Sequence, residues 1–256
     1  MSNLHDYSVL DKIKFDYQPI GVKFSLEKPE GVDLLEGKYF LCELLRYAHE
    51  GKAFYVSELQ CGTQVMGYEE YPPVMYSGQL GAVFNMFKDP AANRRIYDYT
   101  PHLPYHSVKY ITHAPLDKMN FDPDLLIFTT KPSQAEILLR ASSFADGKMW
   151  NSKATTCLAC AWNYAQPYMS GQMNYTITGL GFSMKAIHAM PEGLIIISFP
   201  GNTIGSLLEN LNEMELYPHW FELGGKEQFL AERIKKEGEM RARIFGDEKK
   251  DAPDIG

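Results

Sequence analysis

The spacing of apolar and polar residues predicts a chain of alternating helices and strands. Apolar residues at every second position predict a strand over 19–24, and apolar residues three and four apart predict a helix over 39–49. A near-continuous apolar run over 193–199 predicts a strand buried on both faces. The other expected strands are 53–56, 108–111, 124–129 and 174–178, and the other expected helices are 7–15, 78–87, 133–144, 156–164, 203–214 and 226–244.

This order of elements predicts an α/β fold, with α+β as the alternative, in which helices cover a mixed sheet. No internal repeat or low-complexity linker divides the chain. We therefore expect a single globular domain over residues 1–246 and a frayed C-terminal tail over 247–256.

The composition favours a soluble, cytoplasmic protein. Of the 256 residues, 45% are hydrophobic and 22% are charged, which allows a sizeable core. The net charge of −7 argues against a nucleic acid or an anionic membrane as the main partner. The N-terminus has no signal-peptide pattern and no apolar run could span a bilayer, so we expect four reduced cysteines or metal ligands rather than disulfides. The 13% aromatic content suits a pocket or a homo-oligomer interface.

Two of the four cysteines form a Cys-x-x-Cys pair, Cys157 and Cys160. If Thr155 or Thr156 caps the following helix, Cys157 lies in its first turn, where free N–H groups and the helix dipole stabilise a thiolate. Both sulfur atoms could then face one ion or cluster. The alternative, given equal weight, is two small residues packed beneath a helix.

The other two cysteines lie in different contexts. Cys42 lies a quarter-turn from the apolar stripe of its helix, where Arg46 at i+4 would lower the pKa of the thiol if the side chains meet. Cys61 precedes Gly62 in a turn-rich loop, whose backbone freedom suits close wrapping of a ligand. An inert, half-buried thiol is the alternative for Cys42.

Four thiolates brought together would suit an iron–sulfur cluster, with zinc as the alternative. The spacing of Cys42 and Cys61 fits no standard zinc ribbon or ferredoxin run, so a partial site completed by His or solvent stays open. The first hypothesis is a metalloprotein of redox or cofactor metabolism that acts on a small molecule or a redox partner protein. A metal-free thiol enzyme, with Cys157 as nucleophile and Cys160 as resolving thiol, is the second. A non-catalytic module that binds or senses a small molecule is the third.

The loop at 97–106 is a further candidate pocket. Tyr99, His102, Tyr105 and His106 could line a polar pocket mouth, although Pro104 makes a helical His-x-x-x-His metal site improbable. A hydrogen-bonded surface loop is the favoured alternative. At the start of the helix near 203, Asn202 is expected to be a plain helix cap rather than part of an anion site. The glycines at 179 and 181 lack the third glycine of a dinucleotide loop.

Several segments together resemble a known family. In order and spacing, residues 17–205 resemble the domain-of-unknown-function 169 family of anaerobic bacteria and archaea. The resemblance implies a cysteine-based site at Cys42, Cys61 and Cys157 or Cys160 and an anaerobic setting, but no reaction. Members often carry Cys-x-Gly-x-Arg where this chain has no cysteine and has Lys185 near the arginine position. The segments that carry the resemblance are Pro19–Phe24, Cys42–Tyr55, Cys61–Gly62 with Gly67, Asp122–Ile127, Cys157–Gly171, and Gly179–Gly181 followed by Pro191–Pro200.

Overall fold

A computed structural model describes residues 5–178 and 181–246, and the expected frayed tail at 247–256 lies outside these ranges. The chain divides into two compact units, Met1–Met214 and Glu215–Gly256. In its described part, the second unit holds a 3-10 turn, η5 (His219–Glu222), and one long helix, α9 (Lys226–Phe245), which has no buried residue.

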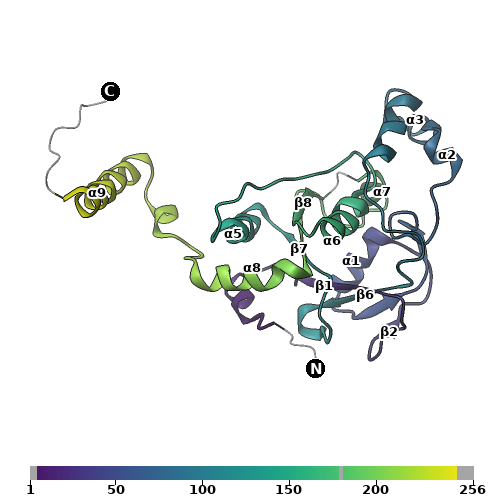
Figure 1. Ribbon diagram of the computed structural model, residues 1–256, viewed down its shortest axis with the longest axis horizontal. Coiled ribbons are helices and arrows are strands. Elements are labelled where there is room, and N and C mark those ends of the chain that lie inside the picture. Colours follow the sequence, from purple (N-terminus) through teal and green to yellow (C-terminus); the bar gives the residue numbers. More distant parts are fainter. Residues whose placement is uncertain (1–4, 179–180, 247–256) are drawn as a thin grey trace. The chain divides into compact units, whose positions relative to one another are not determined.

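A mixed sheet of seven strands forms the centre of the first unit (Figure 1). The strand order is β2-β4-β6-β1-β7-β9-β8, and the pair β2–β4 is parallel while the other neighbours are antiparallel. A separate parallel pair, β3–β5, lies outside this sheet. The strands are β1 (Ile20–Ser25), β2 (Asp33–Leu34), β3 (Tyr39–Phe40), β4 (Phe54–Val56), β5 (Leu59–Cys61), β6 (Tyr110–Pro115), β7 (Leu125–Thr130), β8 (Asn174–Ile177) and β9 (Ile195–Pro200).

Helices cover both faces of the sheet. In Figure 1, α5 and α8 lie on one side of the strands, and α1 and α6 lie on the other. This arrangement confirms the predicted fold of a mixed sheet covered by helices. The helices are α1 (Leu41–His49), α2 (Pro73–Tyr76), α3 (Gln79–Val83), α4 (Pro90–Arg94), α5 (Pro132–Ser143), α6 (Gln166–Ser170), α7 (Phe182–Ala186) and α8 (Gly201–Glu213), with single turns η1 (Ser8–Lys12), η2 (Arg95–Asp98), η3 (Leu116–Lys118) and η4 (Ala161–Ala165).

The strands follow from the pattern of apolar side chains. In β1, Ile20 and Val22 are fully buried and belong to the core that contacts α1. In β9, five of the six residues are buried, as predicted for a strand with helices on both of its faces. None of the described helices is both long enough and apolar enough to cross a membrane.

Several helices differ from the prediction. The segment expected as a helix over 7–15 holds only the 3-10 turn η1, the one over 78–87 holds only the five residues of α3, and the first two residues of the one over 39–49 form β3. The helix predicted over 156–164 instead covers residues 159–170 without a break, with η4 as a π-helical turn in its middle. It cannot begin earlier because Leu158 has φ of +60°, which interrupts a right-handed helix. The helix predicted from residue 203 begins at Gly201, so Pro200 is its N-cap and Asn202 lies inside its first turn. The prediction that Asn202 caps this helix was therefore wrong.

Candidate functional site

All four cysteines line one cavity of about 320 Å³. Cys42 is the second residue of α1, Cys61 ends β5, and Cys157 and Cys160 lie on either side of the start of the 159–170 helix. The fold thus gathers sulfur atoms from three segments that are far apart in the sequence.

The small sheet places the first two cysteines. In the β3–β5 pair, Phe40 is the register partner of Cys61, and α1 begins at the next residue, Leu41. Gly62 follows with φ of +92°, and a Cβ at this position would lie 2.9 Å from the Cβ of Leu41. A glycine is needed here both for the backbone conformation and for the close approach of the two segments.

A network of backbone and side-chain bonds places the second pair. The hydroxyl of Thr155 donates to the carbonyl oxygen of Cys157, and the indole Nε1 of Trp162 donates to Thr155 Oγ1 over 2.7 Å. The N–H of Phe182 donates to the carbonyl oxygen of Thr156 over 3.2 Å, which connects this segment to α7. Neither threonine caps the helix. The expectation that Cys157 lies in its first turn was wrong, and that position belongs to Cys160.

Burial raises the pKa of all four thiols. It raises the pKa of Cys42 to about 12, with smaller contributions from Cys61 and Glu43, and the pKa of Cys157 to about 11. Burial also raises the pKa of Cys61, and it raises the pKa of Cys160 well above its usual range, with further repulsion from Cys61 and Cys42. Without a cation in the cavity these groups are therefore protonated thiols at neutral pH.

Three sulfur atoms lie against hydrogen-bond donors that favour the thiolate. Backbone N–H groups at the starts of two helices lower the pKa of Cys42 and of Cys160, opposing the larger effect of burial. The N–H of Gly62 and the hydroxyl of Ser183 do the same for the pKa of Cys61. Donors aimed at sulfur are the outer shell that stabilises metal-bound thiolates.

Arg46 does not act on Cys42 in the way the spacing suggested. Its Nη2 lies 3.6 Å from the carboxylate of Glu43, and its guanidinium carbon lies 5.1 Å from the ring centre of Tyr47. The groups that shift the pKa of Cys42 are burial, Cys61 and Glu43, and Arg46 is not among them. The expectation that Arg46 lowers this pKa was wrong, because the guanidinium has closer partners.

Apart from its thiols, the cavity is largely apolar. Sequence reasoning missed these lining residues, since they come from short helices and loops without strong periodicity. They are Leu41, Met75, Leu80, Phe84, Met86, Tyr97, Leu158, Ala159, Gly181, Phe182, Ser183 and Met184. A ligand here meets soft thioether, thiol and aromatic groups rather than charges.

The candidate pocket residues of the 97–106 loop lie elsewhere. Tyr99, His102, Tyr105 and His106 are all exposed, and none of them lines the cysteine cavity. Tyr97, two residues before the first of them, does line it.

A buried polar pair lies beneath the cavity. His113 of β6 is fully buried, and its Nε2 lies 3.1 Å from the hydroxyl oxygen of Tyr164, which is 1% exposed. The thiols of Cys42 and Cys160 both act on the pKa of Tyr164, after the larger effect of burial, and raise it. Tyr164 therefore lies between the thiols of Cys42 and Cys160 and His113 of the central sheet.

Two kinds of metal centre use cysteine thiolates as ligands, a single zinc ion and an iron–sulfur cluster. Within residues 5–178 and 181–246, no three His, Cys, Asp or Glu side chains are placed to hold a single metal ion. Tetrahedral zinc, with Zn–S bonds of about 2.3 Å, would need sulfur atoms roughly 3.8 Å apart. An iron–sulfur cluster is larger than one zinc ion and takes four cysteines, the number of thiols that line this cavity.

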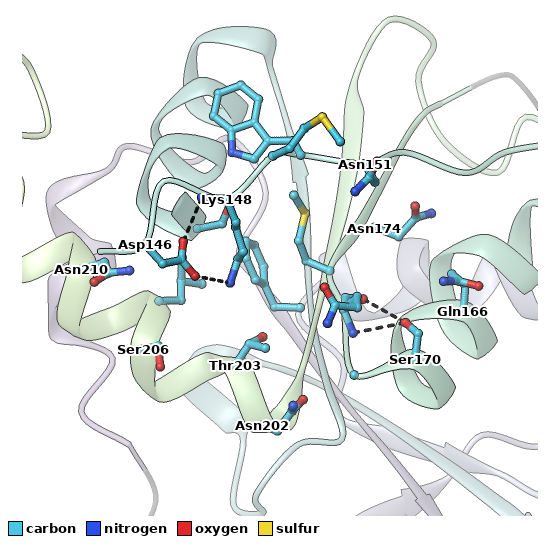
Figure 2. A pocket seen from close by; sticks show the side chains of 18 of the residues that line it. Asp146, Lys148, Asn151, Gln166, Ser170, Asn174, Asn202, Thr203, Ser206 and Asn210 are labelled. Carbon is cyan, nitrogen blue, oxygen red and sulfur yellow. Dashed lines mark hydrogen bonds and ion pairs between the residues drawn. The ribbon is translucent and has the colours of Figure 1, made fainter. Parts of the chain in front are cut away.

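A second cavity, of about 500 Å³, lies at the other end of the 159–170 helix. Figure 2 shows its polar side chains, which come from the 146–151 loop, from α6 and the start of β8, and from α8. The side chains of Asn151, Gln166 and Asn202 make no hydrogen bond with the described part of the chain, whereas the amide of Asn174 donates to two backbone carbonyls. Size and free amides make this cavity a candidate small-molecule site.

The fold and the site define an α/β protein with a cysteine-lined cavity between a helix start and a sheet edge. The chain belongs to the DUF169 family, described as "Uncharacterised ArCR", which it matches over residues 9–210. It is similar to "Uncharacterized protein MJ0308" of Methanocaldococcus jannaschii, with 26% identity over 211 residues, which cover 78% of this chain and 89% of the relative. No solved structure matches the chain.

Proposed function

We propose that this protein holds an iron–sulfur cluster on Cys42, Cys61, Cys157 and Cys160 and works in redox or cofactor metabolism. The observation that carries the proposal is that all four cysteines of the chain line one cavity, although they come from three distant segments. Free cysteines used only as packing have no reason to meet in one place.

A cationic occupant would offset the electrostatics that oppose thiolates in the cavity. Burial and mutual repulsion raise the pKa of Cys42 and raise the pKa of Cys160 well above its usual value. Iron cations would offset both effects, since a coordinating thiol is deprotonated by the metal itself. When bound, the cluster would supply electron transfer or a Lewis acid to the apolar cavity.

The same shifts favour a metal centre over a metal-free thiol enzyme. A nucleophilic cysteine needs a pKa near or below neutral, and the pKa of Cys157 is instead raised to about 11 by burial. Under this proposal the protein works in a reducing cytoplasmic compartment of an anaerobe, with a small-molecule substrate or a redox partner protein.

Anaerobic reconstitution with iron and sulfide tests the proposal. We expect a brown protein with visible absorption and roughly two to four irons per chain, the content of the common cluster types. Replacing Cys42 or Cys160 with Ser should remove most of the iron. The matched control is Met184→Leu, which changes a side chain of the same cavity at nearly constant volume and carries no thiol. A folded, colourless, iron-free wild-type protein would overturn the proposal.

The second cavity favours a second candidate function, the binding of a small polar molecule. Its support is the group of three amides, Asn151, Gln166 and Asn202, that face about 500 Å³ without partners in the described chain. Thermal shifts with a panel of sugars, nucleosides and amino acids test it. A stabilising ligand should lose its effect in Asn202→Leu and keep it in Cys42→Ser, and a panel without any shift would remove this candidate.

A further inference from the structure

The second cavity, of about 500 Å³, presents uncharged polar groups that the protein itself does not use. Figure 2 shows three of these side chains, Asn151, Gln166 and Asn202, on different sides of the cavity. Four carboxamides and one hydroxyl of the lining make no hydrogen bond with the described part of the chain, and they belong to Asn151, Gln166, Gln172, Asn202 and Ser206. These groups are therefore left for a ligand.

Two other amides of the same cavity are used to build its walls. The side-chain amide of Asn174 donates to the carbonyl oxygens of Lys153 and Trp162, and its oxygen accepts the N–H of Lys153 over 2.9 Å. The side-chain amide of Asn210 donates to the carbonyl oxygen of Ala141 over 2.8 Å. Both asparagines are buried, so their bonds fix the 146–151 loop region and α8 around the cavity.

The charges of the cavity favour a neutral ligand. Asp146 is the only acid among the described residues that line it, and its carboxylate lies 3.2 Å from Nζ of Lys148. A cationic group of a ligand would therefore find no unpaired carboxylate. Lys153 is the one lining cation without an ion pair in the described chain, but it is exposed, where a single ion pair contributes little. A charged ligand would lose more hydration than this lining restores.

The chemistry of the free groups indicates what they would bind. A carboxamide has a donor NH₂ and an acceptor oxygen, and a hydroxyl group also donates and accepts. Adjacent hydroxyl groups can therefore pair with both ends of one side-chain amide without any charge. Gln166 is already half-buried, so a ligand that covers it must supply hydrogen-bonding groups or leave its amide unsatisfied. Free amides on several elements call for several hydroxyl groups on one molecule.

Apolar side chains complete the lining. Trp150 lines the cavity, and Nε1 of its indole donates to Oγ of Ser143 over 3.2 Å, which orients the ring. Met173 and Phe199 add further apolar surface. An aromatic ring offers a flat apolar face, and apolar walls with a few polar groups are typical of small-molecule sites. A ring compound with hydroxyl groups matches this lining, because its edge is polar and its faces carry C–H groups.

We infer that the second cavity binds a neutral ring compound with several adjacent hydroxyl groups, the chemistry that monosaccharides share with the ribose of nucleosides. The free amides pair with the hydroxyl groups, and the indole of Trp150 packs on a face of the ring. This inference rests on the second candidate function proposed above and specifies its ligand class. A volume of about 500 Å³ lies within the range of small-molecule sites.

Calorimetric titration of the full chain tests the ligand class. The neutral panel consists of monosaccharides, disaccharides and nucleosides, and the charged panel consists of glucuronate, glycine and inorganic phosphate. Glucuronate is the matched counterpart of glucose, because it differs only in a carboxylate that replaces the CH₂OH group. We expect binding from the neutral panel and none from the charged panel. Comparison of adenosine with ribose shows whether a base belongs to the ligand.

Side-chain variants test the assignment to this cavity. Gln166→Met removes a free amide at nearly constant side-chain length and should weaken binding about three- to tenfold. Gln79→Met is the matched control, because Gln79 of α3 is exposed and does not line the cavity, and it should leave the affinity unchanged. Lys153→Gln should also leave the affinity for the neutral compound unchanged, whereas Trp150→Leu should weaken it about two- to tenfold. Thermal unfolding confirms that the variants are folded.

The outcomes separate this inference from the proposed functions. Binding of glucuronate, glycine or phosphate without binding of any neutral compound would overturn the inference and leave the small-molecule site standing. Equal affinities of Gln166→Met and Gln79→Met for a neutral ligand would overturn the assignment to this cavity. A protein that binds no member of either panel would remove both the inference and the second candidate function. The cluster is tested separately, by the iron content.

Discussion

Replacing Tyr164 with Phe should destabilise the protein through His113 rather than through lost packing. The hydroxyl of Tyr164 is 3.1 Å from Nε2 of His113, and both side chains are essentially excluded from solvent. Nδ1 of the same imidazole has no partner in the described chain. Removal of the hydroxyl would leave a fully buried imidazole without any hydrogen bond.

The magnitude follows from this geometry. A buried polar group that loses its partner costs about 1–3 kcal/mol, and the phenyl ring keeps the remaining contacts of Tyr164. In a unit of this size each kcal/mol lowers the melting temperature by about 2–4 °C. We therefore expect Tyr164→Phe to melt roughly 5 °C below the wild type.

Thermal unfolding and urea unfolding of the metal-free protein are the assays, with Tyr168→Phe as the matched control. Tyr168 lies on the next turn of the same helix, is 42% exposed and donates no hydrogen bond within the described chain, so its variant should differ from the wild type by less than about 0.5 kcal/mol. His113→Leu with Tyr164→Phe completes a double-mutant cycle, in which the pair should cost less than the sum of the single changes. Equal stabilities of Tyr164→Phe and Tyr168→Phe would refute the reasoning.

Three further predictions concern pH, backbone and thiol chemistry. Burial lowers the pKa of His113 from 6.5 to about 3 and that of His49 to about 4. As the pH falls, these histidines are therefore protonated in the unfolded chain before they are protonated in the folded protein. The free energy of unfolding should keep its full value above about pH 6.5. Below that pH it should fall by about 1.4 kcal/mol per pH unit for each histidine as the pH drops toward 4. The urea midpoint of His113→Leu should therefore fall less steeply with pH than that of the wild type. Gly62→Ala should lower both the melting temperature and the iron content more than Gly51→Ala does. Both glycines have positive φ, but a Cβ at Gly51 meets nothing within 4 Å, whereas one at Gly62 would meet Leu41. Similar effects of the two changes would contradict this prediction. Iodoacetamide should label the metal-free thiols slowly at pH 7 and about tenfold faster per pH unit toward pH 9. The half-buried Cys61 and Cys157 should react before the buried Cys42 and Cys160, and rapid labelling at neutral pH would contradict the raised pKa values.

Most of the central sheet could be predicted because its longer strands carry local patterns, whereas the short strands β2, β3 and β5 carry none and were missed. The alternation in β1 and the apolar run in β9 depend on burial that repeats along the chain, so the sequence alone marks them. The boundary at Leu158 left no such mark, because leucine favours helices and nothing nearby signals a left-handed residue. Arg46 was misjudged for a related reason. Spacing along the helix makes Cys42 a neighbour of Arg46, but Glu43 and Tyr47 are neighbours of Arg46 too. Only the structure shows that the guanidinium contacts Glu43 and Tyr47.

The site, too, could be predicted from the sequence only in part. Thiols can be recognised as candidates from their chemistry alone, yet the cavity that they share exists because two glycines permit close approach. A Cβ at Gly62 would lie 2.9 Å from the Cβ of Leu41, and one at Gly181 would lie 2.7 Å from the Cβ of Ala159. Each contact draws a segment against the start of a cysteine-bearing helix. The sequence shows where each glycine lies but not which distant side chain packs against it. The cavity therefore could not be predicted from the sequence, because it depends on these long-range contacts.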